Sequence, residues 1–500
     1  MLRNSLIVIL TLIAGTFNTA YSQNDKPIFV ESWVTNPDRS ALFQKQPDSV
    51  FFRNSNSGWG IPIVVDDKQQ FQEIDGFGFA LTGGSAELLM KMSAAARAKL
   101  LQELFTWNHN NIGISYIRLS IGSSDMNRFV FSYDDVKEGE TDFDLKKFSL
   151  SQDLNDVIPV MKEILTINPG IKILGSPWSA PEWMKTNNNV RGGALKKECY
   201  DVYAMYFVKY IQEMKNQGIT LDAITIQNEP LNSKNTPSMQ WLWTEQAEFI
   251  KNNLGPAIVK AGLTTKIILF DHNLDRIDYP LAMLNDPDVA KYADGSAFHH
   301  YGGEINSMSN LHLARPDKNL YFTEQMVVEN PADKTISISE QVLRLIVGTT
   351  RSWSKNVILW NLAADPKNDP HTDHGGCSMC QGAITIDGEN ISRNIAYYTI
   401  AHASKFVRPG SVRVASTYTG DKTVSLTEDE EHPGIKRVTL IENTQVLPNV
   451  TFRTPDGKIV IIVVNDTWSA NSFSIRYRGK FAGFRLSPGA VGTYVWRAEG

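Results

Sequence analysis

The sequence predicts an α/β protein built on a (β/α)8 barrel (TIM barrel), with an all-β sandwich domain attached to it. Three observations predict this fold. Between about residues 72 and 405, short apolar runs alternate with long amphipathic stretches, as in parallel strands joined by helices. Eight such runs can be counted, which fits a closed barrel better than an open sheet. On both sides of this region, apolar residues recur at every second position, as in antiparallel strands.

The apolar runs define the predicted barrel strands. We expect them at residues 74–80, 115–121, 171–177, 223–227, 266–271, 295–299, 320–324 and 357–361. Between them, residues 85–105 and 200–214 carry apolar side chains at helical spacing, and Gly218 provides a stop signal after the second helix.

The segments on both sides of the barrel region are predicted to form β-strands. In the C-terminal part, strands are expected at 438–441, 459–464, 473–477 and 491–496. The β-rich segment before the barrel should complete their sandwich, because a few strands alone would leave an exposed edge. The predicted divisions are therefore a signal peptide at 1–22, an N-terminal β segment at 23–71, a catalytic barrel at 72–408 and a C-terminal sandwich at 409–500.

The N-terminus resembles an export signal. Arg3 precedes an apolar run at 6–17, and the small-x-small sequence Ala20-Tyr21-Ser22 follows it. The run is shorter than the roughly 20 residues that span a bilayer. We expect a cleaved signal peptide, a secreted or periplasmic protein and no stable membrane anchor.

Charge excludes several classes of partner. The 500 residues carry a formal net charge of −5, without long runs of Lys or Arg. This pattern predicts no binding to nucleic acid or to an anionic membrane, and it fits a neutral substrate. Nothing in the sequence specifies an oligomeric state.

Two glutamates end predicted barrel strands, where the catalytic side chains of such barrels lie. Glu229 follows the fourth strand in Asn228-Glu229-Pro230, and Glu324 ends the seventh. A random Glu at a strand end is usually a surface residue, but Pro230 turns the chain off the strand at Glu229. Two carboxyls facing one cavity can cleave a glycosidic bond, one as proton donor and the other as nucleophile or base.

Seven short motifs resemble family 30 of the glycoside hydrolases in clan A, the group of glucosylceramidases, β-1,6-glucanases and β-xylosidases. In chain order they are Asp75-Gly76-Phe77-Gly78, Tyr116-Ile117-Arg118-Leu119-Ser120, Ser176-Pro177-Trp178-Ser179, Gln227-Asn228-Glu229-Pro230, His299-His300-Tyr301, Thr323-Glu324 and Trp360-Asn361-Leu362-Ala363. The resemblance implies a retaining enzyme with Glu229 as acid/base and Glu324 as nucleophile, no cofactor and no metal. Their carboxyls should then lie roughly 5 to 5.5 Å apart.

The same resemblance suggests further substrate-binding residues. It implies that Asn228 binds the sugar 2-hydroxyl and that Trp178 and Trp360 wall the sugar subsite, although both tryptophans could simply pack the barrel top. Arg118 is expected to orient Glu324, and Tyr301 to donate a hydrogen bond to it. His299 and His300 are weaker candidates, because a His near a core is more often only hydrogen-bonded.

The resemblance departs from the glucosylceramidase pattern at Gly83, where such members carry a hydroxyl-binding Asp. This departure and the Gly-Phe-Ala-Leu-Thr-Gly-Gly-Ser sequence around it favour the bacterial β-1,6-glucanase branch, with glucosylceramidase and β-xylosidase as alternatives. Asp125 or Asp373 could supply the missing carboxylate.

The sequence also allows other interpretations of the cysteine segment and of the function. The segment His371 to Cys380 places two His and two Cys at three-residue intervals, which allows a zinc site, a local Cys377–Cys380 disulfide or free thiols. A non-catalytic carbohydrate-binding protein would keep the barrel but not need both glutamates. A transglycosylase would use the same pair as a hydrolase.

Overall fold

The computed structural model describes residues 27–47, 50–60, 62–330, 332–418, 422–428, 436–442 and 446–498. The predicted signal peptide at 1–22 lies outside these residues. Among the described helices, none is long and apolar enough to cross a membrane.

Eight parallel strands close into a barrel, as the sequence predicts, and the last pairs with the first. Alternate inward side chains fill its interior, as in other barrels of this type. One buried cluster of such side chains comprises Tyr116, Leu174, Ala223, Ile268, Ala297, Tyr321 and Ile358. The strands are β5 (Gly76–Leu81), β6 (Tyr116–Ser120), β7 (Lys172–Ser176), β8 (Ala223–Thr225), β9 (Lys266–Asn273), β10 (Ala293–His299), β11 (Asn319–Glu324) and β12 (Ser354–Leu359).

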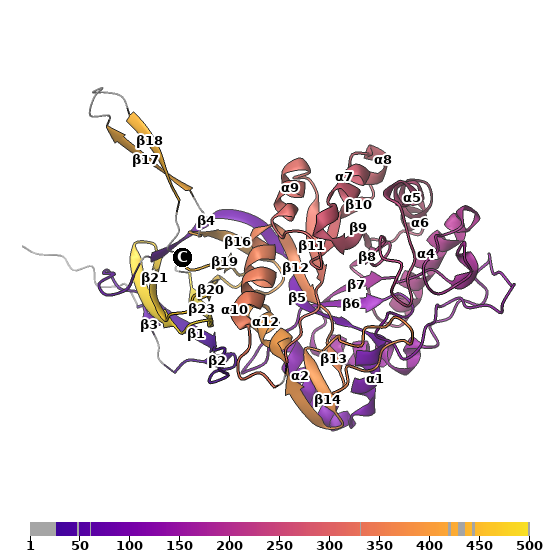
Figure 1. Ribbon diagram of the computed structural model, residues 1–500, viewed down its shortest axis with the longest axis horizontal. Coiled ribbons are helices and arrows are strands. Elements are labelled where there is room, and N and C mark those ends of the chain that lie inside the picture. The colour runs from indigo at the N-terminus through magenta and orange to yellow at the C-terminus, as the bar shows by residue number, and fades with distance from the viewer. Residues whose placement is uncertain are drawn as a thin grey trace, which may run out of the picture.

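Helices surround the barrel (Figure 1). The prediction of one helix at 85–105 is wrong: the chain forms α1 (Gly83–Lys91) and α2 (Ala94–Phe105), because Ser93 caps a new helix there. Helix α4 (Tyr200–Asn216) matches its prediction, and Gly218 follows it with a φ of 84°. The other α-helices are α3 (Val157–Ile167), α5 (Trp243–Phe249), α6 (Gly255–Lys260), α7 (Asp278–Leu284), α8 (Pro287–Ala290), α9 (Ser307–Ala314), α10 (Ile338–Gln341), α11 (Thr349–Arg351) and α12 (Ile395–Ser404).

Segments from both ends of the chain build the β-sandwich, as predicted. Strand β1 (Phe29–Thr35) pairs with β23 (Val491–Arg497), and the long β4 (Pro62–Ile74) pairs with β16 (Ser411–Ser416) before the chain enters the barrel. Its remaining strands are β2 (Gln44–Lys45), β3 (Val50–Phe51), β19 (Asn449–Arg453), β20 (Lys458–Val464), β21 (Asn471–Tyr477) and β22 (Lys480–Leu486).

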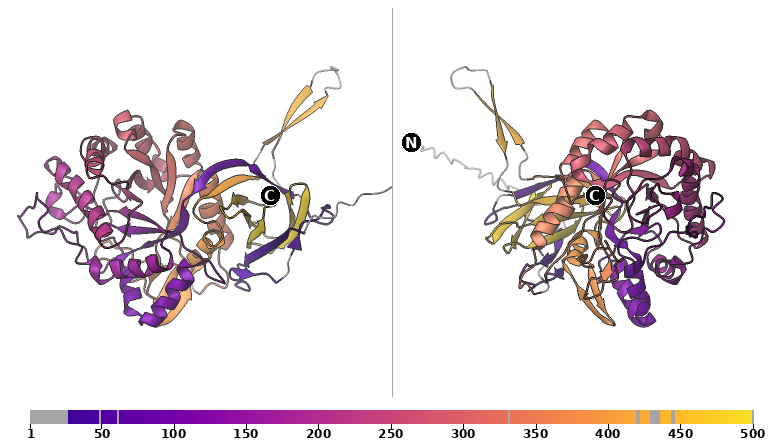
Figure 2. Two further views of the ribbon diagram at one scale, coloured as in Figure 1. Left: turned by 180° about the vertical axis from the view of Figure 1, so that it is seen from behind. Right: turned by 45° about the vertical axis from the view of Figure 1, so that its right-hand side comes forward.

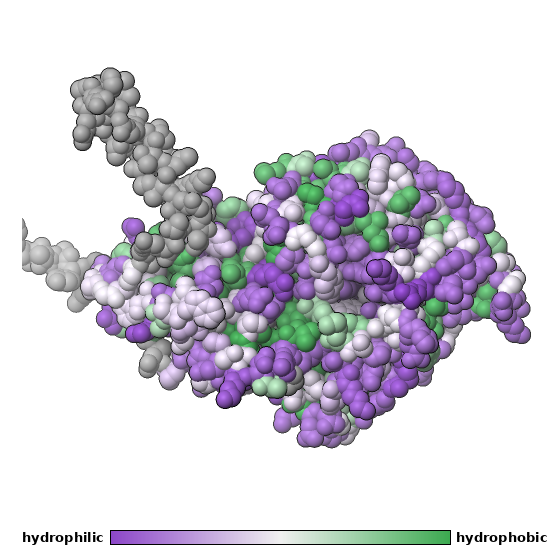
Figure 3. All heavy atoms as spheres, viewed as in Figure 1, coloured by the Kyte–Doolittle hydropathy of each residue, from purple (hydrophilic) through white to green (hydrophobic). Residues whose placement is uncertain are grey.

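The sandwich lies beside the barrel in all views (Figures 1 and 2). At the junction, His402 of α12 contacts the Thr35 and Thr493 hydroxyls of the sandwich at 2.8 and 2.9 Å. Hydrophilic residues cover most of the barrel face seen in Figure 3.

Two small sheets are formed separately from the barrel sheet and the sandwich sheet. The pair β17 (Lys422–Glu428) and β18 (Lys436–Glu442) forms a ribbon that projects from the sandwich (Figure 1). The sheet of β13 (Ala363–Ala364), β14 (Ile384–Asp387) and β15 (Asn390–Arg393) belongs to the segment after β12.

Candidate active site

The two predicted glutamates come from barrel strands that lie three apart. Glu324 is the last residue of β11, and Glu229 follows the end of β8. Glu229 adopts a left-handed φ of 50°, and its backbone N–H donates to the carbonyl of Asp271, 3.0 Å away. Asp271 also has a left-handed φ, of 66°. Because this conformation costs a non-glycine residue about 1–2 kcal/mol, the strand ends are held in a particular arrangement by their surroundings.

The structure brings both carboxyls to one buried point. One oxygen of Glu229, one of Glu324 and a ring nitrogen of His299 all lie within 4.8 Å of one another. His299 Nδ1 is 3.3 Å from Glu229 Oε1 and 3.8 Å from Glu324 Oε1. The second oxygen of Glu229 accepts a hydrogen bond from Asn232 Nδ2 at 2.7 Å.

Arg118 on β6 lies beneath this pair and contacts three acceptors. Its guanidinium donates to Glu324 Oε2 at 2.5 Å, to Asn228 Oδ1 at 2.7 Å and to Asp271 Oδ2 at 2.8 Å. A guanidinium can only donate, so the Asn228 oxygen faces Arg118 and its amide NH₂ points elsewhere. Arg118 therefore fixes the orientation of both residues.

Sequence reasoning missed Asp271, which is fully buried at the centre of the network. Its carboxylate accepts hydrogen bonds from Arg118 and His299 and from three hydroxyls, those of Ser176, Thr225 and Thr323. The rule that polar residues ending barrel strands form the site would have found it, because Asp271 ends the predicted fifth strand. Its interactions hold its pKa well below the ordinary value, against the effect of burial.

Charges in the site compensate one another. Burial lowers the pKa of His299, but Glu324, Asp271 and Glu229 outweigh it and raise that pKa to about 9, so the ring is protonated at neutral pH. Burial raises the pKa of Glu229, but His299, His272 and Asn232 outweigh it and lower that pKa to about 2. For Glu324 burial prevails: its pKa is raised, and His299 and Arg118 offset only part of the effect.

Tyr301, the aromatic residue predicted to contact Glu324, lies at an exposed position. Tyr301 is 44% exposed, yet its hydroxyl donates to Glu324 Oε1 at 3.1 Å, as expected, and accepts from the Met326 N–H. The neighbouring His300 instead contacts the carbonyl of Gly303 at 3.1 Å. Of the two weaker candidates, only His299 thus contacts the glutamates.

Trp178 and Trp360 lie together above Arg118. Their ring centroids are 5.2 Å apart, and the Arg118 guanidinium lies 4.8 Å from the Trp178 ring. Both rings are almost completely buried. Packing at the barrel top therefore accounts for most of their surface, and only a small part of it faces open space.

The cysteine loop packs against this tryptophan pair. Of the three states that the sequence left open, the structure has the Cys377–Cys380 disulfide. Cys380 packs in one cluster with Trp178 and Trp360 and lies 3.5 Å from the Met326 sulfur. Because both sulfurs are bonded to each other, they are not available as zinc ligands.

Glu229, Glu324 and His299 are also of types that bind metals. Both nitrogens of His299 face carboxylates, Asp271 on one side and Glu229 on the other. A protonated imidazole has no lone pair to offer a metal ion. The charge state of His299 therefore favours an ion-pair network over a metal site.

A side chain from the loop after β6 lies directly against Gly83. A Cβ built on Gly83 would lie 1.9 Å from Asn127 Nδ2, so the Asn127 amide occupies the space of a side chain there. Asp125, in the same loop, is 7% exposed, whereas Asp373 is exposed. Burial raises the pKa of Asp125 well above its usual range, and the charges of Glu324 and Glu229 raise it further.

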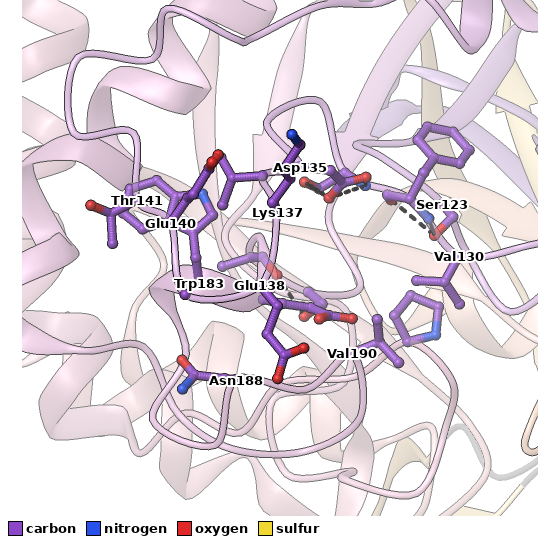
Figure 4. A pocket seen from close by; sticks show the side chains of 18 of the residues that line it. Ser123, Val130, Asp135, Lys137, Glu138, Glu140, Thr141, Trp183, Asn188 and Val190 are labelled. Carbon is purple, nitrogen blue, oxygen red and sulfur yellow. Dashed lines mark hydrogen bonds between the residues drawn. The ribbon is translucent and has the colours of Figure 1, made fainter.

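A cavity of 720 Å³ lies between the loops that follow β6 and β7 (Figure 4). Its lining includes Ser123, two residues before Asp125, and Ser179, which directly follows Trp178. Carboxylates and aromatic rings also line it, among them Asp135, Glu138 and Trp183. Its volume is typical of ligand pockets.

Several known proteins are similar to this chain in both sequence and fold. The model of the glycosyl hydrolase family 30 TIM-barrel domain matches residues 74–407, and that of the family 30 beta sandwich domain matches 434–494. An endo-1,6-beta-D-glucanase of Neurospora crassa is 34% identical over 408 residues, covering 78% of this chain and 82% of that protein. The lysosomal acid glucosylceramidase of Mus musculus is 27% identical, covering 89% and 85%. The solved structure of the endo-beta1,6-glucanase BT3312 has a TM-score of 0.82 at 32% identity, covering 94% and 100%.

Proposed function

The chain belongs to glycosyl hydrolase family 30, and we propose that it is an endo-acting β-1,6-glucanase that retains the configuration of the anomeric carbon. The observation that carries this proposal is the approach of the Glu229 and Glu324 carboxyl oxygens to within 4.8 Å. Inverting glycosidases hold their carboxyls about 6.5–9.5 Å apart to admit a water molecule. The shorter separation supports direct attack on the sugar by one of the two.

Glu324 is the nucleophile in this proposal. Arg118 and Tyr301 each donate to one of its oxygens, which orients the carboxylate and stabilises its charge. In the first step a Glu324 oxygen bonds to the anomeric carbon as the bond to the leaving oxygen breaks. The product of this step is a glycosyl ester of Glu324.

Glu229 is the acid/base. It gives its proton to the leaving oxygen in the first step, and in the second it takes a proton from the water that cleaves the ester. Glu229 has the lower pKa of the pair, so its role is assigned from the resemblance of Asn228-Glu229-Pro230 to the family motif and not from the order of the pKa values. The two carboxyl groups lie within 4.8 Å of each other, so the charge of Glu229 acts on Glu324 and contributes to its raised pKa.

Of the remaining predicted residues, some bind the sugar and others act through the two glutamates. Asn228, whose amide NH₂ points away from Arg118, donates to the 2-hydroxyl, where hydrogen bonds strengthen in the transition state. The open parts of Trp178 and Trp360 wall the subsite. Arg118 and His299 act through Glu324 and Glu229, because their own polar atoms face those groups.

Similarity to β-1,6-glucanases supports a β-1,6-linked glucan, rather than a glycolipid, as the substrate. Relatives with that activity in their names are 32–34% identical to the chain, and the mouse glucosylceramidase is 27% identical. Asn127 also fills the space where an acidic side chain at position 83 would lie. The cavity between the β6 and β7 loops supports endo action, because it has room for sugar units and its lining residue Ser179 directly follows Trp178.

We also propose that the protein is exported, on the basis of its N-terminal sequence. N-terminal sequencing of the protein recovered from outside the cytoplasm tests this point. A start at Gln23 is the expected result, and an intact Met1 would contradict it.

The substrate is tested by comparing kcat/KM on a β-1,6-gluco-oligosaccharide and on detergent-dispersed glucosylceramide, with β-1,3-glucan and xylan as controls. We expect clear preference for the β-1,6 linkage and internal cleavage of long chains. A preference for the lipid would refute the substrate assignment and leave the two-glutamate mechanism intact. Products formed with excess acceptor sugar would show whether transfer competes with hydrolysis.

A further inference from the structure

Seven consecutive residues of the loop after β6 form one wall of the 720 Å³ cavity. Every residue from 135 to 141 lines the cavity, and Asp135 and Glu138 are among those labelled in Figure 4. This segment, the cavity wall, is flanked by Asp134 on one side and Asp142 on the other. An interaction between these two side chains therefore joins the two ends of the cavity wall.

Asp134 and Asp142 are hydrogen-bonded to each other inside the protein. Asp134 has no exposed surface, and Asp142 is 7% exposed. Trp183 Nε1 donates to Asp134 Oδ2 at 3.2 Å, whereas no donor among the described residues reaches Asp134 Oδ1. Ionised carboxylates only accept, so two carboxyls can bond to each other only when one of them holds a proton. The contact therefore contains a shared proton.

This proton belongs to Asp134. Burial raises the pKa of Asp134, and the charge of Asp142 raises it further, to about 6. Burial also tends to raise the pKa of Asp142, but the backbone N–H groups of Lys147 and Lys146 and the bond from Asp134 outweigh it and lower that pKa. One of these donors, the Lys147 N–H, lies 2.6 Å from Asp142 Oδ2. In weak acid the pair thus consists of a neutral Asp134 and an ionised Asp142.

Other ionisable groups on neighbouring elements face the pair. Lys209 of α4 favours the ionised form of Asp134, and Lys147 favours the ionised form of Asp142. Tyr206 of α4 stays neutral, because burial holds its pKa well above the ordinary value. Burial outweighs the charge of Lys209, so Asp134 keeps its raised pKa.

The hydrogen bonds that side chains of the cavity wall itself make lie at the surface. Asp135 accepts from the N–H and the hydroxyl of Ser132, and Glu140 forms an ion pair with Lys147 in which both side chains are about half exposed. Exposed ion pairs contribute little to stability. The buried contact between the two flanking aspartates is therefore the stronger constraint on the position of the wall.

We propose that the proton shared between Asp134 and Asp142 holds the cavity wall in place, and that its loss at higher pH loosens the wall and weakens the binding of a glucan chain. Both aspartates are positioning residues, because they act through the segment between them. The effect on glucan binding rests on the proposed function, whereas the effect on the wall does not.

The direction of the pH dependence follows from the raised pKa of Asp134. When the wall loosens and Asp134 meets water, its pKa returns toward the ordinary value of 3.8. The held wall is therefore favoured most below about pH 4, and it loses this advantage as the pH rises through about 6. Above that pH, two negative charges face each other in a buried place, which is unfavourable.

Hydrogen exchange tests the wall without any substrate. After correction for intrinsic rates, the backbone amides of residues 135–141 in the wild type should exchange at least about 10-fold faster at pH 7 than at pH 4. In Asp142→Asn the amide can donate to an ionised Asp134 at every pH, so most of this pH dependence should disappear. Asp144→Asn alters an exposed ion pair close by in the chain, and as the matched control it should keep the wild-type pH dependence.

Kinetics test the consequence for the substrate. Between pH 4 and pH 7, KM on long β-1,6-glucan should rise more steeply in the wild type than in Asp142→Asn. A small aryl β-glucoside lacks the further sugar units, so its KM should follow the same course in both proteins. Thermal unfolding of each variant checks that the fold persists.

The outcomes separate this inference from the proposed function. Equal exchange rates at pH 4 and pH 7 in the wild type, or an unaltered pH dependence in Asp142→Asn, would overturn the role of the pair. If Asp142→Asn fails to fold, Asp134→Asn decides by the same criterion, because its amide can donate to Asp142. A KM on glucan with the same pH course in wild type and variant would overturn the link to glucan binding. A wild type inactive on β-1,6-glucan would overturn the glucanase assignment together with that link, and hydrogen exchange would still decide whether the shared proton holds the wall.

Discussion

Arg118 and Asp271 form an ion pair at 2.8 Å in which neither side chain has any exposed surface. The pair is connected to both Glu324 and Glu229: Arg118 also donates to Glu324, and His299 contacts both Asp271 and Glu229. The positions of the Glu229 and Glu324 carboxyls thus depend on a third carboxylate, which is completely buried.

Replacing Asp271 with Asn should therefore harm both stability and turnover. It leaves the Arg118 charge without its carboxylate partner, and breaking a buried pair costs about 3–5 kcal/mol. Denaturant unfolding measures this loss, and kinetics should show a fall in kcat larger than any change in KM. The exposed pair Lys146–Asp144 provides the control, since Asp144→Asn should change stability by less than about 1 kcal/mol. Similar effects for the two variants would argue against a central role for Asp271.

Replacing Glu229 with Ala should affect substrates according to their leaving groups. Natural glucans need a proton on the departing oxygen, and activated aryl glycosides do not. The loss in kcat/KM should be far larger for the glucan, and added azide should partly restore turnover of the aryl glycoside by replacing the activated water. Equal losses on both substrates, without azide rescue, would remove Glu229 from the acid/base role.

Replacing His299 with Gln should move the pH profile upward. Protonated His299 lowers the pKa of Glu229, to about 2, and also opposes the raised pKa of Glu324. Without that positive charge, both carboxyls hold their protons to higher pH. Both limbs of the profile of kcat/KM should therefore shift to higher pH, and a neutral replacement of the exposed His374 serves as control. An unchanged profile would show that His299 does not set these pKa values.

Removing the Cys377–Cys380 disulfide should weaken substrate binding more than it weakens the fold. The bridge closes a very short loop, so its contribution to stability is at most about 2 kcal/mol. Because Cys380 packs with Trp360, the double Ser variant should show a raised KM. Reductant should raise KM of the wild type in the same way and have no effect on the double variant. If neither change affected KM, the disulfide loop would not contribute to substrate binding.

Much of the fold follows from sequence because strand and helix periodicities are local. All eight barrel strands could be predicted, whereas the break at Ser93 could not, since the apolar spacing continues across it and a single cap decides it. Glu229 and Glu324 could be found as strand-end carboxylates. The partners of Asp271 depend on which side chains from distant segments meet, and a single sequence does not contain that geometry.

The proposed mechanism requires a glycosyl ester on Glu324, and trapping this ester tests the mechanism most directly. A 2-deoxy-2-fluoroglucoside with a good leaving group slows the second step, so the sugar should accumulate on the enzyme. Mass spectrometry of a protease digest should find it on the peptide containing Glu324, and Glu324→Gln should be unlabelled and inactive, while the exposed Glu198→Gln control remains labelled and active. A label on another residue, or an unlabelled wild type that releases inverted product, would contradict the mechanism.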